Sequence, residues 1–224
     1  DVYNPATGKV TGKVEFASTE LVGKTVEVAS KAFDEWRHSS LTKRTQVLFA
    51  FRELLNQNKA KIAELITAEH GKVLSDAQGE VTRGLEVVEF ACGIPHLLKG
   101  GYSEEVSTGV DVYSIRQPLG PVAIISPFNF PAMVPMWFFP VALACGNSVI
   151  IKPSEKDPSA IMFIAELFEE ISGSVLVVYP GRFQPFHKGH QAVYNYLVKH
   201  YGRDQVFIST SNKIDPPKSP FGFT

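Results

Sequence analysis

Cysteine is scarce in this chain: among 224 residues only Cys92 and Cys145 occur, far apart and outside any CxxC or Cys/His spacing. Their number and placement exclude a disulfide framework and give no zinc pattern, so we expect no bound metal ligated by the chain. Free thiols are typical of a reducing compartment, which predicts a cytoplasmic protein.

Long apolar runs are also lacking. The most apolar segment, 132–145, is shorter than the roughly 20 residues that a membrane span needs, and Pro135 and Pro140 interrupt it. We therefore expect a buried helix there and no membrane partner. The chain has no secretory leader pattern and opens on Asp1 rather than Met, which suggests a missing beginning.

Net charge is nearly absent, at −1, and the 44% hydrophobic and 20% charged composition is typical of a globular protein. The charge is unevenly divided, because residues 173–224 carry +4 and the rest of the chain carries −5. A basic carboxy-terminal piece suits phosphate-bearing ligands, although most of these charges are expected to be solvated. We expect nucleotides, but no nucleic acid, among the partners.

Residues 18–98 carry apolar side chains at helical spacing, which predicts a layer of helices. Alternation over residues 110–117 then predicts one or two extended strands. The residues placed to begin or end helices are Ser18, Ser40 and Ser75 as N-caps, and Gly71 and Gly100 as stops.

Strands and helices alternate in the rest of the chain. The expected elements are strands at 122–126, 148–152, 175–179 and 205–209, helices at 131–144, 159–170 and about 188–201, and a loop at 180–187. This order predicts parallel strands with ligands at their carboxyl ends. The predicted fold class is α/β, with a helical layer and a partial Rossmann-like unit in residues 1–171 and a second partial Rossmann-like βαβ unit in residues 172–224.

Polar and aromatic side chains gather at the ends of the strands at 122–126 and 148–152. The carboxamide of Asn129 can stabilise an oxyanion, and Lys152 and Glu155 can hydrogen-bond ribose hydroxyls. Ser126 and Phe128 can line the channel between them. The pattern indicates a nucleotide site, and the alternative interpretation of Lys152 is a solvated charge at a strand end.

Six segments of residues 1–170 resemble the aldehyde dehydrogenase family, most closely its methylmalonate-semialdehyde dehydrogenases, the acylating branch that uses NAD and coenzyme A. They are NPATG at 4–8, EHGK at 69–72, VEFACGIPH at 88–96, PLGP at 118–121, SPFNFP at 126–131 and KPSE at 152–155. The resemblance implies an oxyanion donor at Asn129 and NAD contacts from Ser126, Phe128, Lys152, Glu155 and Lys156. It also implies that residues 110–117 belong to an arm through which such proteins form homo-oligomers.

In that family a Cys thiolate attacks the aldehyde, hydride passes to NAD, and the thioester is transferred to coenzyme A. The family pattern puts that Cys and the glycine-rich turn beside the nicotinamide beyond residue 170, and we expect both to be missing here. Cys92 and Cys145 are expected to be packed and inert. His70 and His96 are expected to serve the scaffold.

A second motif, GRFQPFHKGH at 181–190, lies between an expected strand and an expected helix. A phosphate-handling loop needs close backbone approach, positive donors and a helix start, and this segment offers all three. His187 and His190 can face one anionic group, with Gly189 between them. Residues 175–190 are similar to the nucleotidylyltransferase superfamily, most closely to nicotinamide-mononucleotide adenylyltransferases.

That second resemblance implies attack by a mononucleotide phosphate on the α-phosphate of ATP or another nucleoside triphosphate, with Mg²⁺. His187 and His190 would hold the triphosphate. The residues expected in the loop beneath it are Gly181, Arg182, Phe183 and Gly189.

Three interpretations of the whole chain remain open. The chain is a composite of two truncated enzymes, complete in neither activity, joined near residue 172 in nature or by a join of unrelated genes. Alternatively it is a nucleotide-binding module that retains only the HxGH site, or a non-catalytic fragment that dimerises through residues 110–117. The source DNA across codons 165–180 tests the join, and thermal protection by nucleotides separates the other two.

Overall fold

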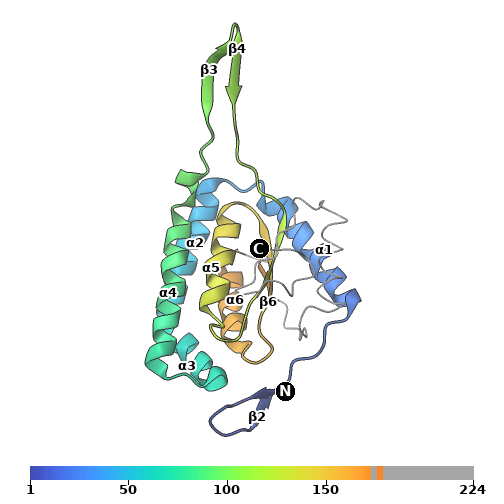
Figure 1. Cartoon of the computed structure of the whole chain (residues 1–224), viewed down its shortest axis with the longest axis vertical. Coiled ribbons are helices and arrows are strands. Elements are labelled where there is room, and N and C mark those ends of the chain that lie inside the picture. Colours follow the sequence, from blue (N-terminus) through green and yellow to red (C-terminus); the bar gives the residue numbers. More distant parts are fainter. Residues whose placement is uncertain (173–175, 179–224) are drawn as a thin grey trace, which may run out of the picture.

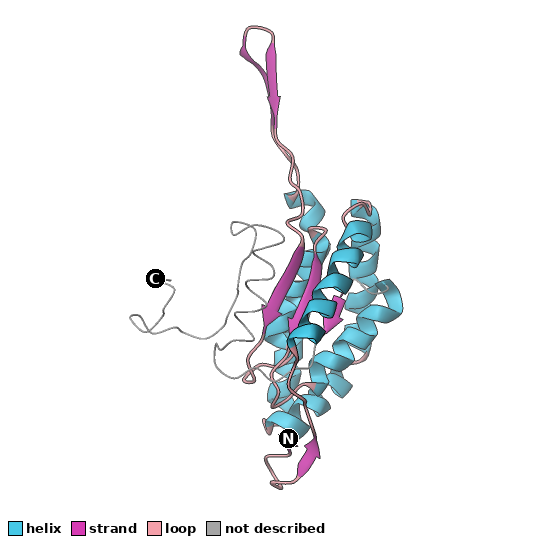
Figure 2. Ribbon diagram, turned by 90° about the vertical axis from the view of Figure 1, so that its right-hand side faces the viewer, coloured by secondary structure: helices cyan, strands magenta, loops and turns pink. Residues whose placement is uncertain are grey.

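The computed structural model describes residues 1–172 and 176–178 (Figures 1 and 2). The strands are β1 (Val2–Tyr3), β2 (Val10–Gly12), β3 (Tyr102–Ser107), β4 (Val110–Tyr113), β5 (Pro121–Ile125), β6 (Ser148–Lys152) and β7 (Leu176–Val178). The helices are α1 (Thr19–Trp36), α2 (Leu41–Gln57), α3 (Lys59–His70), α4 (Leu74–Cys92), α5 (Met133–Ala144) and α6 (Ser159–Ser172), with a 3₁₀ turn η1 (Ile94–Leu97). The expected α/β class is confirmed.

Serine caps begin the first two helices, as expected. The hydroxyls of Ser18 and Ser40 each accept the backbone N–H three residues later, at 3.2 and 3.1 Å. Each bond satisfies a donor that a helix start leaves without an intrahelical partner. The expectation for Ser75 is wrong, because α4 begins one residue before it and Val73, at the N-cap position, makes no side-chain cap.

Gly71 ends α3, as expected, with a φ of +86° that glycine adopts at low cost. Gly100 does not end a helix, since α4 stops at Cys92 and η1 follows it. The apolar spacing runs through both elements, so periodicity alone does not mark the break between them.

β5, β6 and β7 form one parallel sheet in that order. The register pairs Ile125 with Lys152 and Ile151 with Val178, so the carboxyl ends of the strands lie along one edge. Every residue of β6 is buried, which fits the central strand of a sheet covered on both faces. The expected strands at 122–126 and 148–152 are therefore present, the first shifted by one residue.

The sheet continues past the expected division of the chain at 171/172. α6 runs to Ser172, and β7 pairs with β6 rather than with a separate sheet. Among the described residues, the two sides of that division therefore share one sheet. The expected loop at 180–187, helix at about 188–201 and strand at 205–209 lie outside the described residues.

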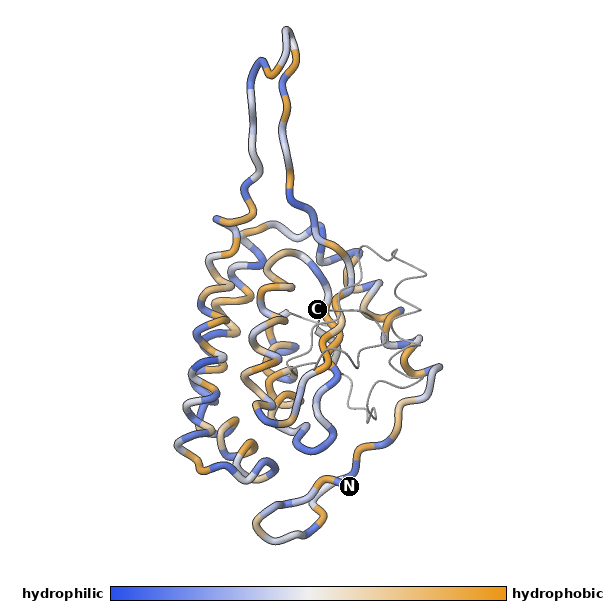
Figure 3. The backbone as a smooth tube through the Cα atoms, in the orientation of Figure 1, coloured by the Kyte–Doolittle hydropathy of each residue, from blue (hydrophilic) through white to orange (hydrophobic). Residues whose placement is uncertain are grey.

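Helices cover both faces of the sheet. In Figures 1 and 2, α5 and α6 lie against one face with α2, α3 and α4 outside them, and α1 lies against the other. The core between these helices centres on Phe51, Phe139 and Phe168, whose ring centroids are 5.0–6.3 Å apart. Figure 3 shows the apolar residues concentrated in the sheet and along the inner sides of the helices.

The apolar segment at 132–145 forms α5, as expected, and Pro135 and Pro140 both lie within that single helix. Pro135 falls in the first turn, where a missing N–H costs nothing, whereas Pro140 removes one interior hydrogen bond. In the part of the chain that the structure describes, no helix combines the length and the apolar character that crossing a membrane requires.

β3 and β4 form an antiparallel hairpin that projects from the body (Figures 1 and 2). All of their residues are exposed. The hairpin contains the first half of the segment 110–117 in which one or two strands were expected, and no strand covers residues 114–117. Its large exposed apolar side chains, with the one that follows it, are Tyr102, Val106, Val110, Val112, Tyr113 and Ile115.

Candidate nucleotide-binding site

The carboxyl ends of β5 and β6 bring the first group of expected site residues together. The backbone N–H of Ser126 donates to the carbonyl oxygen of Lys152 at 3.0 Å, which continues the strand pairing by one residue. Ser126 is buried beside it. The two segments that carry the expected contacts, 126–129 and 152–156, therefore leave the sheet side by side.

Lys152 is buried, with 7% of its surface exposed, and is not the solvated charge that the alternative interpretation describes. Its Nζ lies 3.6 Å from the carboxylate of Glu155. Burial lowers the pKa of Lys152, and the charge of Glu155 opposes that change. A desolvated ammonium beside a partly exposed carboxylate offers a donor and an acceptor next to each other, the pair that a ribose diol requires.

Phe128 joins the two segments. The residue is 47% exposed, and its ring lies below the ammonium of Lys156, with Nζ 4.1 Å from the ring centroid. The imidazole of His70 stacks on it at 6.3 Å with an interplanar angle of 22°. Burial lowers the pKa of His70, and the nearby ammonium of Lys72 adds to that effect. The ring of Phe128 forms the apolar wall of the site, and it is contacted by an imidazole and an ammonium.

Asn129 lies in the turn before α5, and its side chain is exposed. The backbone carbonyl oxygen of Asn129 accepts from Nζ of Lys72 at 3.0 Å. That ammonium is also paired with the buried carboxylate of Glu80, at 2.6 Å. The sequence-based site did not include Lys72 or Glu80, and the only signal for Lys72 was its place in the segment EHGK.

The sequence pattern of the aldehyde dehydrogenase family matches residues 1–214. The chain belongs to the aldehyde dehydrogenase family. A malonate-semialdehyde dehydrogenase of Pseudomonas aeruginosa is 53% identical over 170 residues, which are 76% of this chain and 34% of that protein. The human mitochondrial, acylating methylmalonate-semialdehyde/malonate-semialdehyde dehydrogenase is 41% identical over 213 residues, which are 95% of this chain and 39% of that protein.

Solved aldehyde dehydrogenase structures share the fold. A methylmalonate-semialdehyde dehydrogenase of Oceanimonas doudoroffii superposes with a TM-score of 0.82 at 40% identity, over 94% of this chain and 46% of that one. A protein of Sinorhizobium meliloti described under the same enzyme name and solved with NAD gives 0.82 at 42% identity, over 94% of this chain and 41% of that one. The chain spans about a third of the length of the curated relatives it matches.

The two cysteines of this aldehyde dehydrogenase chain lie away from the site. Cys145 follows α5, whereas Asn129 precedes it, and 12 helical residues separate the two ends by roughly 18 Å. Cys92 ends α4, and Glu80 lies 12 residues earlier in that helix, again roughly 18 Å away. Burial raises the pKa of both thiols, which fits the expectation of packed, inert side chains.

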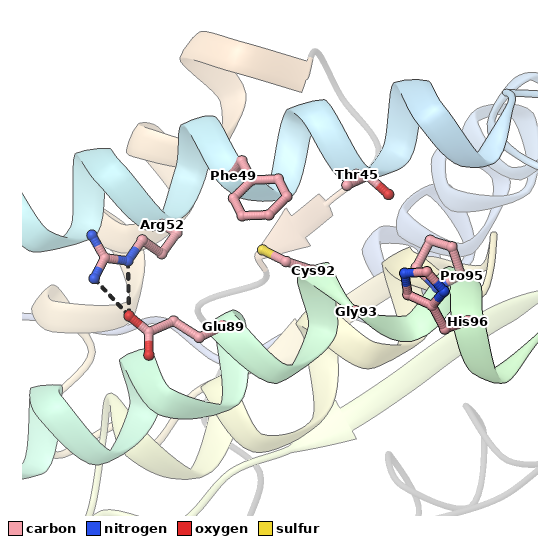
Figure 4. Close-up of a pocket in the computed structure, with 8 residues that line it drawn as sticks. All are labelled: Thr45, Phe49, Arg52, Glu89, Cys92, Gly93, Pro95 and His96. Carbon is pink, nitrogen blue, oxygen red and sulfur yellow. Dashed lines mark hydrogen bonds and ion pairs between the residues drawn. The ribbon is translucent and has the colours of Figure 1, made fainter.

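Cys92 contributes instead to an open groove between α2, the end of α4 and η1 (Figure 4). An ion pair between Arg52 and Glu89, at 2.6 Å, closes one side of the groove, and Pro95 and His96 line the other. His96 therefore lies with the scaffold at the far end of α4, apart from the residues that follow β5 and β6.

The second group of expected site residues lies outside the described residues. It comprises His187, His190, Gly181, Arg182, Phe183 and Gly189. The aldehyde dehydrogenase pattern extends through these positions, and nothing in the comparisons shows a nucleotidylyltransferase segment.

Proposed function

We propose that this chain is part of an NAD-dependent, coenzyme A-acylating dehydrogenase of methylmalonate or malonate semialdehyde, and that its described residues form the ribose-binding side of the NAD site. The relatives named above carry one or both of these substrates in their names, the human relative is named as acylating, and one related structure contains NAD. Coenzyme A and a homo-oligomer through residues 110–117 belong to the same proposal.

The observation that carries the proposal is the buried ammonium of Lys152 at the carboxyl end of β6. A lysine seldom loses its hydration unless a partner repays the cost. Here the partner is Glu155, which is 27% exposed on its side chain and so can accept from a ligand while it remains paired. Ligands of parallel α/β sheets bind at this edge.

The remaining side chains of the site have separate proposed roles in ligand binding and in the reaction. Phe128 offers an exposed ring face to a flat or apolar part of the ligand, and Lys156 and His70 fix the angle of that ring. The exposed carboxamide of Asn129 would donate to a developing oxyanion. Bound NAD would supply the hydride acceptor for the oxidation.

Titration calorimetry of the purified chain with NAD tests the proposal. We expect binding in the micromolar to millimolar range, and we expect Lys152→Met to weaken it by about tenfold or more, which is about 1.4 kcal/mol. Lys61→Met, which removes an exposed charge on α3, is the matched control and should change little. Heat changes absent up to about 10 mM NAD in the unaltered chain would refute a site formed by these residues.

A second proposal concerns residues 175–224, where the HxGH motif supports binding of a nucleoside triphosphate with Mg²⁺. Binding of a non-hydrolysable ATP analogue that His187→Ala and His190→Ala abolish would support it. Unchanged affinity in both variants would refute it.

A further inference from the structure

Glu80 is a buried acid in the middle of the helical layer. It lies in α4 and is 1% exposed, where an unpaired carboxylate would be strongly unfavourable. Oε2 accepts from Nζ of Lys72 at 2.6 Å, and Oε1 accepts the backbone N–H groups of Ala132 at 2.9 Å and Met133 at 3.1 Å. The negative charge of the Glu80 carboxylate is therefore balanced by an ammonium and by the N–H groups at the start of α5. The start of a helix is the positive end of its dipole, which also stabilises a carboxylate.

The start of α5 depends on this distant acid. Its N-cap position is Ala132, whose side chain cannot accept a hydrogen bond, and no side chain of the loop caps it. Glu80, 52 residues earlier, takes the place of a local cap. Loss of its carboxylate would leave two buried N–H groups unpaired, each at a cost of about 1–3 kcal/mol.

Lys72 links the turn that precedes α5 to the carboxylate of Glu80. Its side chain is 8% exposed, and its Nζ donates both to Glu80 and to the carbonyl oxygen of Asn129 at 3.0 Å. The same nitrogen lies 4.5 Å from the ring centroid of Phe130. The backbone of residues 129–133 is thus bound at its first residue by Lys72 and at its last two by Glu80.

We propose that Lys72 and Glu80 are positioning residues of the candidate site: they place the turn at 128–130 and so set the direction of the Phe128 and Asn129 side chains. Neither residue needs to touch a ligand for this role. The value of that placement for NAD rests on the function proposed above, whereas the placement itself is a property of the chain alone.

Nuclear magnetic resonance of the ¹⁵N-labelled chain tests the role directly. The probes are the side-chain carboxamide of Asn129, assigned with Asn129→Asp, and the exchange rates of the Ala132 and Met133 amides. In Lys72→Met we expect the carboxamide resonances to move, and in Glu80→Met, which removes the acceptor of both N–H groups, we expect the same movement together with exchange of both amides at least about tenfold faster. Lys72→Arg, which keeps the charge, should restore the resonances toward their original positions.

Arg52→Met is the matched control, because Arg52 forms an exposed ion pair with Glu89 of α4 at 2.6 Å and lies away from the turn. It should leave the Asn129 carboxamide and the two amides unchanged. Should Lys72→Met fail to fold, the double variant Lys72→Met/Glu80→Gln removes both buried charges and takes its place.

Unaltered Asn129 resonances and amide exchange in the folded charge-removing variants would overturn the positioning role. A parallel NAD titration separates the two proposals. Moved resonances with no NAD binding in any form of the chain would support positioning and refute the nucleotide site.

Discussion

Asp157 is the most unusual titratable group at the residue scale. It is 2% exposed just before α6, and neither carboxyl oxygen makes a hydrogen bond of ordinary geometry within the described residues. Burial raises its pKa to about 7, and the charges of Glu69 and Glu80 add to the rise, whereas the hydroxyl of Ser154 and the charge of Lys72 oppose it. The protonated form is therefore the one that suits the fold.

Because the pKa of Asp157 is higher in the folded state than in the unfolded state, stability falls as the pH rises from about 4 to 7. Asp157→Asn removes that ionisation. We expect it to change the free energy of unfolding little at pH 4 and to raise it by up to about 4 kcal/mol at pH 8. Urea denaturation at both pH values measures this, with the exposed Asp34→Asn as control. An equal effect at the two pH values would contradict the buried ionisation.

The site residues show how far single positions could be predicted. Ser126 and Lys152 were placed at strand ends by local patterns, and the structure has them adjacent. The burial of Lys152 and the stacking of His70 on Phe128 were not accessible, because both arise from tertiary packing: His70, at the end of α3, stacks on a ring that comes 58 residues later. Side-chain burial is a property of tertiary contacts, which periodicity does not encode.

At the scale of elements, the contact between α4 and α5 depends on glycine. A Cβ at Gly84 would overlap the end of the buried Met136 side chain, whereas a Cβ at Gly79, in the same helix, would meet nothing within 4 Å. We expect Gly84→Ala to destabilise the chain by about 1–3 kcal/mol through overpacking. Gly79→Ala should stabilise it by about 0.5–1 kcal/mol through helix propensity. Thermal unfolding of both variants checks the pair, and destabilisation of equal size would refute the packing argument.

Local sequence patterns encode some helices and strands of this chain and fail to encode others. β6 and α5 were predicted closely, because a short apolar run and a long one each have a distinct length and distinct flanking residues. The start of α4 was missed because Ser75 looks like a cap, yet Val73 holds that position. The acid that caps α5 comes from α4, and no local pattern could reveal a cap supplied from 52 residues away.

At the scale of the whole molecule, the β3–β4 hairpin stands away from the body formed by the rest of residues 1–172. Its residues are exposed, and its two legs meet at the base, where the N–H of Ser114 donates to the carbonyl oxygen of Gly101 at 2.9 Å. We expect the chain to form the proposed homo-oligomer in solution, and we expect replacement of residues 102–113 with a short Gly-Ser turn to give a monomer with little loss of thermal stability. Light scattering after size exclusion measures the mass. An unchanged mass would exclude the hairpin as the contact.

The chemistry open to the 224-residue chain as a whole depends on where its two thiols lie. Thiolate attack on an aldehyde needs an ionisable thiol within reach of the oxyanion donor. The two cysteines of the sequence have raised pKa values and lie roughly 18 Å from the residues around Asn129, measured along α4 and α5. We therefore expect no NADH, followed by absorbance, from methylmalonate semialdehyde with NAD and coenzyme A. NADH formation that Cys145→Ser abolished would show that this partly buried thiol reaches the site after all.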